Sequence, residues 1–286
     1  MVTHFPRPRR IGVHRRPSAV PLTFDLERLR FHFRAVQPVA FKRGSPANML
    51  RGALGKALHK TAAKDYARIF APKSKSGPSG IADAPRPFVF RAAHLDGVRV
   101  APGEPFQFDM HLFDRKPDAA PRMIEAFAHL GRATLESVDQ ETVAIELNGA
   151  PERVARVRVR FVTPTELKAD QRLIGRPEFP VLFGRLRDRI STLRALYGGG
   201  PLDIDFSAMG ERAARVLLVR SQISWIEAER RSGSTGQTHP LGGFIGEAEY
   251  QGDLGEFVPY LRAGQWTGVG RQTVWGKGEI CFDVGC

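Results

Sequence analysis

The chain has 286 residues, which is enough for one large domain or two ordinary ones, and we expect two. Its formal net charge of +13 favours a polyanionic partner such as a nucleic acid or an acidic membrane surface. No apolar run approaches the roughly 20 residues that span a bilayer, the N-terminus lacks a signal-peptide core, and both cysteines lie near the C-terminus. We therefore expect a cytoplasmic protein with no membrane partner, no disulfide framework and no cysteine zinc site.

The first predicted segment is a basic N-terminal arm. Residues 1–22 hold five arginines among four prolines and no acidic residue, so we expect this arm to be largely disordered. From Thr23 apolar and charged residues alternate, which predicts a strand with one buried face. The segment from Pro46 to about Ala63 repeats its apolar residues on one helical face and has a proline at its start, which predicts a helix.

The rest of the N-terminal half is predicted to alternate between strands and a second helix. Strand-like segments cover 87–95 and 104–114, a helix covers about 121–131, and a strand or hairpin covers 133–149. We expect residues 23–150 to form one compact α+β domain.

The second half repeats this order. A strand is predicted over 156–168, an amphipathic helix over 179–198 and a long strand over 215–230. Because the two halves are alike, we predict an α+β protein of two tandem ferredoxin-like (RRM-like) domains, the second over 151–286.

A glycine-rich segment, defined here as residues 264–278, precedes the last predicted strand. Its sequence is GQWTGVGRQTVWGKG. Such a backbone can turn its N–H groups toward phosphate oxygens while basic side chains supply charge. The residues we expect to hold RNA here are Gly268, Gly270, Arg271, Gly276, Lys277 and Gly278. The alternative is that the glycines serve only the geometry of a bulged hairpin.

Four stretches together resemble one family. They are MLRGALGKALHK, RVRFVTPTELK, RRSGSTGQTHPLGG and the C-terminal run from GFIGEAEYQGDL through the glycine-rich segment. The chain is similar, over nearly everything after Thr23, to CRISPR-associated repeat-processing endoribonucleases of the repeat-associated mysterious protein superfamily. The resemblance implies two ferredoxin-like domains and metal-independent cleavage of precursor CRISPR RNA by a ribose 2′-hydroxyl, leaving a 2′,3′-cyclic phosphate and a 5′-hydroxyl. Relatives often carry cysteines near KDYARIFAP; this chain has none there, so we expect no metal or other cofactor.

His59 is the predicted catalytic residue, as general base or acid. On a helical wheel it lies opposite the apolar stripe, on a face that includes Gly52, Gly55 and Lys56, and family members tend to place a catalytic histidine on this helix. We expect Lys56 to stabilise transition-state charge. A solvated surface histidine remains the alternative, and His239, in a polar loop expected to contact RNA, is the rival.

Further RNA contacts are expected from basic side chains outside the glycine-rich segment. These are Lys42, Arg43, Arg230 and Arg231. The expected partner is CRISPR repeat RNA, with a multisubunit effector complex as a further possibility, and the protein would be a monomer or a homodimer. The alternative function is a non-catalytic RNA-binding subunit of a CRISPR effector complex.

Overall fold

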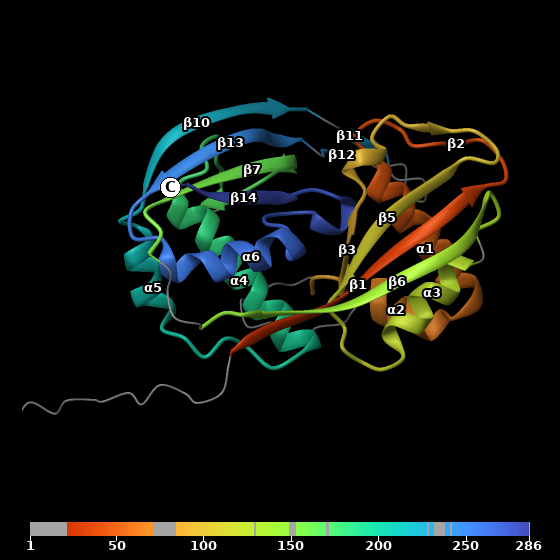
Figure 1. Ribbon diagram of the computed structural model, residues 1–286, viewed down its shortest axis with the longest axis horizontal. Helices are drawn as coiled ribbons and strands as arrows, with labels where there is room; N and C mark the ends of the chain where they lie inside the picture. The colour runs from red at the N-terminus through yellow and green to blue at the C-terminus, as the bar shows by residue number, and fades with distance from the viewer. Residues whose placement is uncertain are drawn as a thin grey trace, which may run out of the picture.

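The computed structural model describes residues 22–70, 84–128, 130–148, 153–169, 172–227, 229–231, 238–240 and 242–285. Two α+β units lie side by side, each with a four-stranded antiparallel sheet backed by helices (Figure 1). The predicted fold class is therefore confirmed. The basic arm falls outside the described residues, apart from Leu22.

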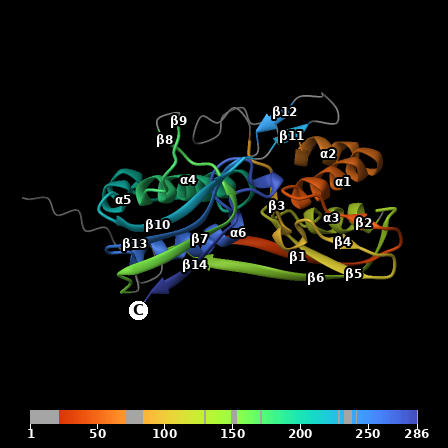
Figure 2. The same ribbon diagram turned by 90° about the horizontal axis from the view of Figure 1, so that it is seen from above.

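The N-terminal sheet has the strand order β3-β5-β1-β6. Its strands are β1 (Thr23–Ala35), β3 (Phe88–Arg91), β5 (Pro105–Leu112) and β6 (Ala133–Glu146), with a side pair β2 (Val39–Ala40) and β4 (Arg99–Val100). Helices α1 (Pro46–Thr61), α2 (Ala63–Phe70) and α3 (Ala119–Ala128) cover one face (Figure 2), and the short helix η1 (Ala93–Leu95) follows β3.

The C-terminal sheet has the strand order β10-β13-β7-β14. Its strands are β7 (Arg156–Thr165), β10 (Leu217–Ile226), β13 (Gly243–Gln251) and β14 (Ile280–Gly285). The helices are α4 (Phe179–Tyr197), α5 (Phe206–Ala213), α6 (Val258–Thr267), η2 (Gly255–Phe257) and η3 (Thr273–Trp275). Two small hairpins complete the domain, β8 (Lys168–Ala169) with β9 (Arg172–Leu173) and β11 (Glu229–Arg231) with β12 (Thr238–Pro240).

Strand β1 joins the two hydrophobic cores. From Leu29 to Ala35 its apolar side chains alternate with polar ones, as the sequence predicted, and pack beneath the helices, whereas Phe24 and Leu26 fall on the opposite face of the strand. Leu26 near its start packs into the C-terminal core, whereas Phe31 and Phe33 pack into the N-terminal core, and all three are fully buried. One strand therefore fixes the two domains relative to each other.

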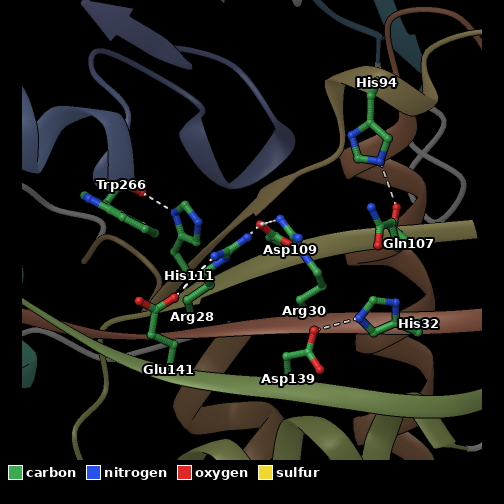
Figure 3. Close-up of polar contacts among 10 residues, drawn as sticks. All are labelled: Arg28, Arg30, His32, His94, Gln107, Asp109, His111, Asp139, Glu141 and Trp266. Atoms are coloured by element: carbon green, nitrogen blue, oxygen red, sulfur yellow. Dashed lines mark hydrogen bonds and ion pairs between the residues drawn. The ribbon is translucent and has the colours of Figure 1, made fainter.

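The C-terminal end of α6 lies in the seam between the domains. The buried Arg91 of β3 donates from Nη2 to the carbonyls of Gln265 and Trp266, at 2.8 and 3.0 Å. His111 of β5 contacts the Trp266 carbonyl through Nδ1 at 2.9 Å (Figure 3), and Arg189 of α4 donates to Thr267. Cations at the C-terminus of a helix interact favourably with the negative end of its dipole. The contacts hold α6, and thus the start of the glycine-rich segment, against both domains.

Three α-helices, α2, α5 and α6, were not predicted, and one ambiguous segment is now assigned. Helices α2 and α5 have eight residues each, which is too short for a clear helical period. Helix α6 ends inside the glycine-rich segment, where Gly264 allows the side chains of Leu186 and Ile280 to approach. Residues 133–146 form a single strand and not a hairpin. No helix within the described ranges combines the length and apolar character needed to cross a membrane.

Candidate active site

Helix α1 presents His59 on its open face. The helix starts at Pro46 and buries Leu50, Leu54 and Leu58, while His59 is exposed. The expectation that His59 points away from the core is confirmed. Lys56 lies one turn earlier, is also exposed and is a neighbour of His59 on the helix surface.

A hollow of about 390 Å³ lies beside His59 on the helix surface. Its lining residues are Arg51, Gly52, Gly55, Lys56, His59, Tyr66 and Phe70. A β-carbon at Gly52 would meet nothing within 4 Å, whereas one at Gly55 would come within 3.2 Å of the Phe70 ring. The two glycines therefore act differently: Gly55 admits the ring that forms the wall, and Gly52 leaves the hollow open.

The wall of the hollow is an aromatic stack contributed by α2. The Tyr66 ring lies parallel to Phe70 with 5.2 Å between centroids, and His59 meets Tyr66 edge to face at 5.2 Å and 87°. Such arrangements are favourable geometries for aromatic pairs. The unpredicted helix α2 thus supplies the surface on which the His59 imidazole rests, and sequence reasoning had left Tyr66 out of the site.

The hollow and the glycine-rich segment lie along the same helix. Helix α1 contacts η3, and the Arg51 guanidinium lies 5.4 Å from the Phe70 ring centre and 5.8 Å from that of Trp275. Arg51 therefore connects the wall of the hollow to the glycine-rich segment. This connection is what the sequence could not show.

The four glycines expected to hold RNA are required by close packing of the backbone. All have positive φ, from 69° at Gly268 and Gly278 to 86° at Gly276. A β-carbon at Gly270 would lie 2.2 Å from the Glu166 carbonyl oxygen, and one at Gly278 would lie 1.9 Å from that of Val269. Geometry alone thus accounts for these glycines, although the segment is a helix end, a turn and η3 instead of a bulged hairpin.

Lys277 is buried, which corrects its predicted role as a phosphate contact. Its ammonium donates to Glu166, to the Gly242 carbonyl and to the side chain of Gln272. Its side chain is only 4% exposed, against 50% for Arg271. Of the two cations predicted to contact RNA in this segment, Arg271 is the one whose side chain reaches the surface.

The other predicted RNA contacts lie around the glycine-rich segment. Lys42 and Arg43 are exposed before α1, and Arg43 lines a cavity of about 710 Å³ between the domains together with Trp275 and Gly276. Arg230 and His239 occupy facing positions of the β11–β12 hairpin, with Arg231 next to them. The side chains of these three residues lie outside the description.

The open face of the N-terminal sheet carries several ion pairs (Figure 3). Asp109 binds Arg28 at 3.0 Å and Arg30 at 2.7 Å, and His32 contacts Asp139 at 2.9 Å. His111 is buried and packs against Trp266. This burial, together with the charge of Arg91, lowers the pKa of His111 to about 3. Cations on this face are matched by carboxylates, so the face does not account for the excess positive charge.

Comparisons with known proteins bear on the family and the fold. Residues 159–280 match the family model described as CRISPR-associated endoribonuclease Cas6, and residues 23–159 match a second model, described as an N-terminal domain. No curated protein matches the chain significantly. The described residues hold no group of three or more histidine, cysteine, aspartate or glutamate side chains placed to bind a metal ion.

Solved structures share the fold over about nine-tenths of the chain. A Cas6 product complex has a TM-score of 0.58 at 17% identity, covering 91% of this chain and 99% of the other. Thermus thermophilus Cas6 has a TM-score of 0.60 at 14% identity, with coverages of 91% and 99%. A partial Cas6-RT-Cas1–Cas2 complex has a TM-score of 0.61 at 13% identity, with coverages of 91% and 46%. The second domain is therefore similar to the Cas6 family of CRISPR-associated endoribonucleases, and the chain shares the fold of solved Cas6 structures.

Proposed function

We propose that the protein cuts precursor CRISPR RNA within its repeats by attack of a ribose 2′-hydroxyl on the adjacent phosphate. The P–O2′ bond forms and the P–O5′ bond breaks, which leaves a 2′,3′-cyclic phosphate and a 5′-hydroxyl, and no metal ion takes part. The observation that carries this proposal is the exposed His59 at the edge of an open hollow on α1.

His59 serves this reaction as general base or general acid. As the base it removes the 2′-hydroxyl proton, and as the acid it protonates the departing 5′-oxygen. Lys56 lines the same hollow, so its ammonium can stabilise the negative charge that builds on the phosphorane. The Tyr66 ring supports the imidazole from the side opposite solvent.

The surface around the hollow has the charge that RNA binding requires. Residues 42–70 contain seven lysines and arginines and only one acidic residue, Asp65. Lys42 and Arg43 at the start of this stretch, and Arg271 in the glycine-rich segment, are the proposed phosphate contacts. Arg230, Arg231 and His239 remain proposed contacts, and the β11–β12 hairpin that carries them lies beside α1 in both views (Figures 1 and 2).

The test is cleavage of the repeat RNA from the protein's own CRISPR array in EDTA, with the product ends mapped. We expect His59→Ala to bind RNA but cut roughly 10²–10⁴-fold more slowly. His94→Ala is the matched control, because His94 is exposed but lies on η1, away from the hollow. Cutting at the wild-type rate by His59→Ala, or loss of wild-type cutting in EDTA, would refute the mechanism. Tight binding by the wild type without any cutting would favour a non-catalytic subunit of an effector complex.

A further inference from the structure

Glu166 binds two cations at once. It follows the end of β7, its side chain is 4% exposed, and its two carboxylate oxygens contact different partners. Oε1 accepts from the Lys277 ammonium at 3.0 Å, and Oε2 accepts from Nη1 of Arg271 at 3.1 Å. A single buried negative charge therefore faces two positive charges.

The two cations are held very differently. Lys277 uses its three ammonium hydrogens on Glu166, on the Gly242 carbonyl and on Oε1 of Gln272, the last at 3.1 Å. Burial lowers the Lys277 pKa, and the hydrogen bond that its ammonium donates to Glu166 opposes that change. The Arg271 side chain is half exposed, and Glu166 is the one carboxylate with which it forms an ion pair among the described residues.

The backbone around Arg271 is fixed even though its side chain reaches the surface. The Arg271 N–H donates to the Glu166 carbonyl at 3.2 Å. The neighbouring Gly270 passes so close to the same carbonyl that no β-carbon would fit. Arg271 can therefore reorient its guanidinium without any movement of the glycine-rich segment.

We propose that Lys277 is the permanent counterion of Glu166, which frees the Arg271 guanidinium to exchange Glu166 for a phosphate of the bound RNA. When Arg271 moves to the phosphate, the buried carboxylate keeps one full positive partner. Without Lys277, the same move would leave a buried carboxylate unpaired, which is strongly unfavourable. Lys277 is thus a positioning residue that controls RNA affinity without touching RNA. This inference rests on the proposed RNA contact of Arg271.

The experiment measures the affinity for repeat RNA as a function of salt, using RNA with a 2′-deoxyribose at the mapped cleavage position. Arg271→Ala should weaken binding roughly tenfold and lower the slope of log affinity against log salt by about 0.7–1, as expected for one lost phosphate contact. Lys277→Met should produce the same loss, because Glu166 then retains Arg271.

The decisive variant is the double substitution Glu166→Gln with Lys277→Met. It removes both buried charges, so Arg271 is released and the affinity and salt slope should return to wild-type values. This variant also covers the case in which Lys277→Met alone fails to fold, since it leaves no unpaired buried charge. Adding Arg271→Ala to the double variant should again remove one phosphate contact.

The outcomes separate this inference from the proposed function. A folded Lys277→Met protein with the wild-type salt slope would overturn the inference, as would a double variant whose affinity does not depend on Arg271. If Lys277 had only a structural role, Lys277→Met would lower the melting temperature. The double variant Glu166→Gln with Lys277→Met would then not restore the slope of log affinity against log salt. Cleavage of unmodified RNA by the wild type is measured in parallel, and its absence would reject the proposed reaction while leaving the binding comparison valid.

Discussion

Gly276 lies so close to Ala47 that a β-carbon at position 276 would be 2.4 Å from the Ala47 Cβ. The contact joins the glycine-rich segment to the first turn of α1, the helix that carries His59. Its backbone φ of 86° also lies in the left-handed region that favours glycine. Two separate physical requirements therefore select glycine at this position.

We predict that Gly276→Ala lowers the free energy of unfolding by about 2–5 kcal/mol, the sum of a left-handed backbone cost and a steric overlap. Gly103→Ala is the control, because Gly103 has φ of 87° and open space around it. The control should lose only about 1–2 kcal/mol. Denaturant unfolding of both variants measures the difference, and equal losses would show that the contact with Ala47 relaxes without cost.

Gly52→Ala should separate stability from activity. Alanine in a helix interior stabilises by about 0.5–1 kcal/mol relative to glycine, and the new methyl group meets no protein atom within 4 Å. That methyl group enters the hollow, so we expect a higher melting temperature together with cleavage slowed by roughly tenfold or more. Gly184→Ala in α4 is the matched control, since its surroundings are also open, and it should gain stability with unchanged cleavage. Unchanged cleavage by Gly52→Ala would mean that the RNA does not enter the hollow at this point.

Tyr66 tests whether the aromatic wall positions His59. Tyr66→Phe keeps the ring against which the imidazole packs, so cleavage should stay within about twofold of the wild-type rate, whereas Tyr66→Ala should slow it by roughly tenfold. Single-turnover rates at saturating RNA measure the effect on chemistry. A large loss in Tyr66→Phe would instead indicate that the hydroxyl group transfers a proton.

His111 should make the protein less stable in acid. Its pKa is about 3 in the fold, against about 6.5 in the unfolded chain, so between these values the unfolded chain binds a proton that the folded chain does not. The stabilisation is complete above pH 6.5 and is lost as the pH falls toward 3, by at most about 1.4 kcal/mol per pH unit. In His111→Gln, whose amide can still donate to the Trp266 carbonyl, this part of the pH dependence should disappear. Unfolding measured from pH 7 to 5 checks the difference, and parallel curves would contradict it.

Regular periodicity made much of the fold predictable. The alternation in β1 and β7 and the apolar stripe of α1 reflect which side of each element is buried, and that information is local. The outward direction of His59 followed from the same helical period. Helix α2 is shorter than the window in which such a period can be recognised. Helix α6 contains Gly264, the first glycine of the glycine-rich segment, which favoured a loop over a helix.

The environment of single polar residues could not be predicted, because their partners are distant in the sequence. Lys277 is buried by Glu166, which lies 111 positions earlier. His111 is covered by Trp266, 155 positions later. Nothing within a local window distinguishes these residues from a surface lysine and a solvated strand histidine. The burial of Lys277 emerges only from the tertiary fold of the second domain, and that of His111 from the contact between the two domains.

Helix α1 has a further consequence for where the RNA is cut. It touches Gly276 at Ala47 and carries His59 about three turns further on, a separation of about 18 Å along the helix axis. A short helix of this kind is stiff along its axis, so the contact at Ala47 and the His59 imidazole move as one body. If RNA is anchored at the glycine-rich segment and cut at His59, as proposed, this fixed distance would select the cleavage point by length, and a repeat would need the correct spacing between these two points more than a particular base at the cut.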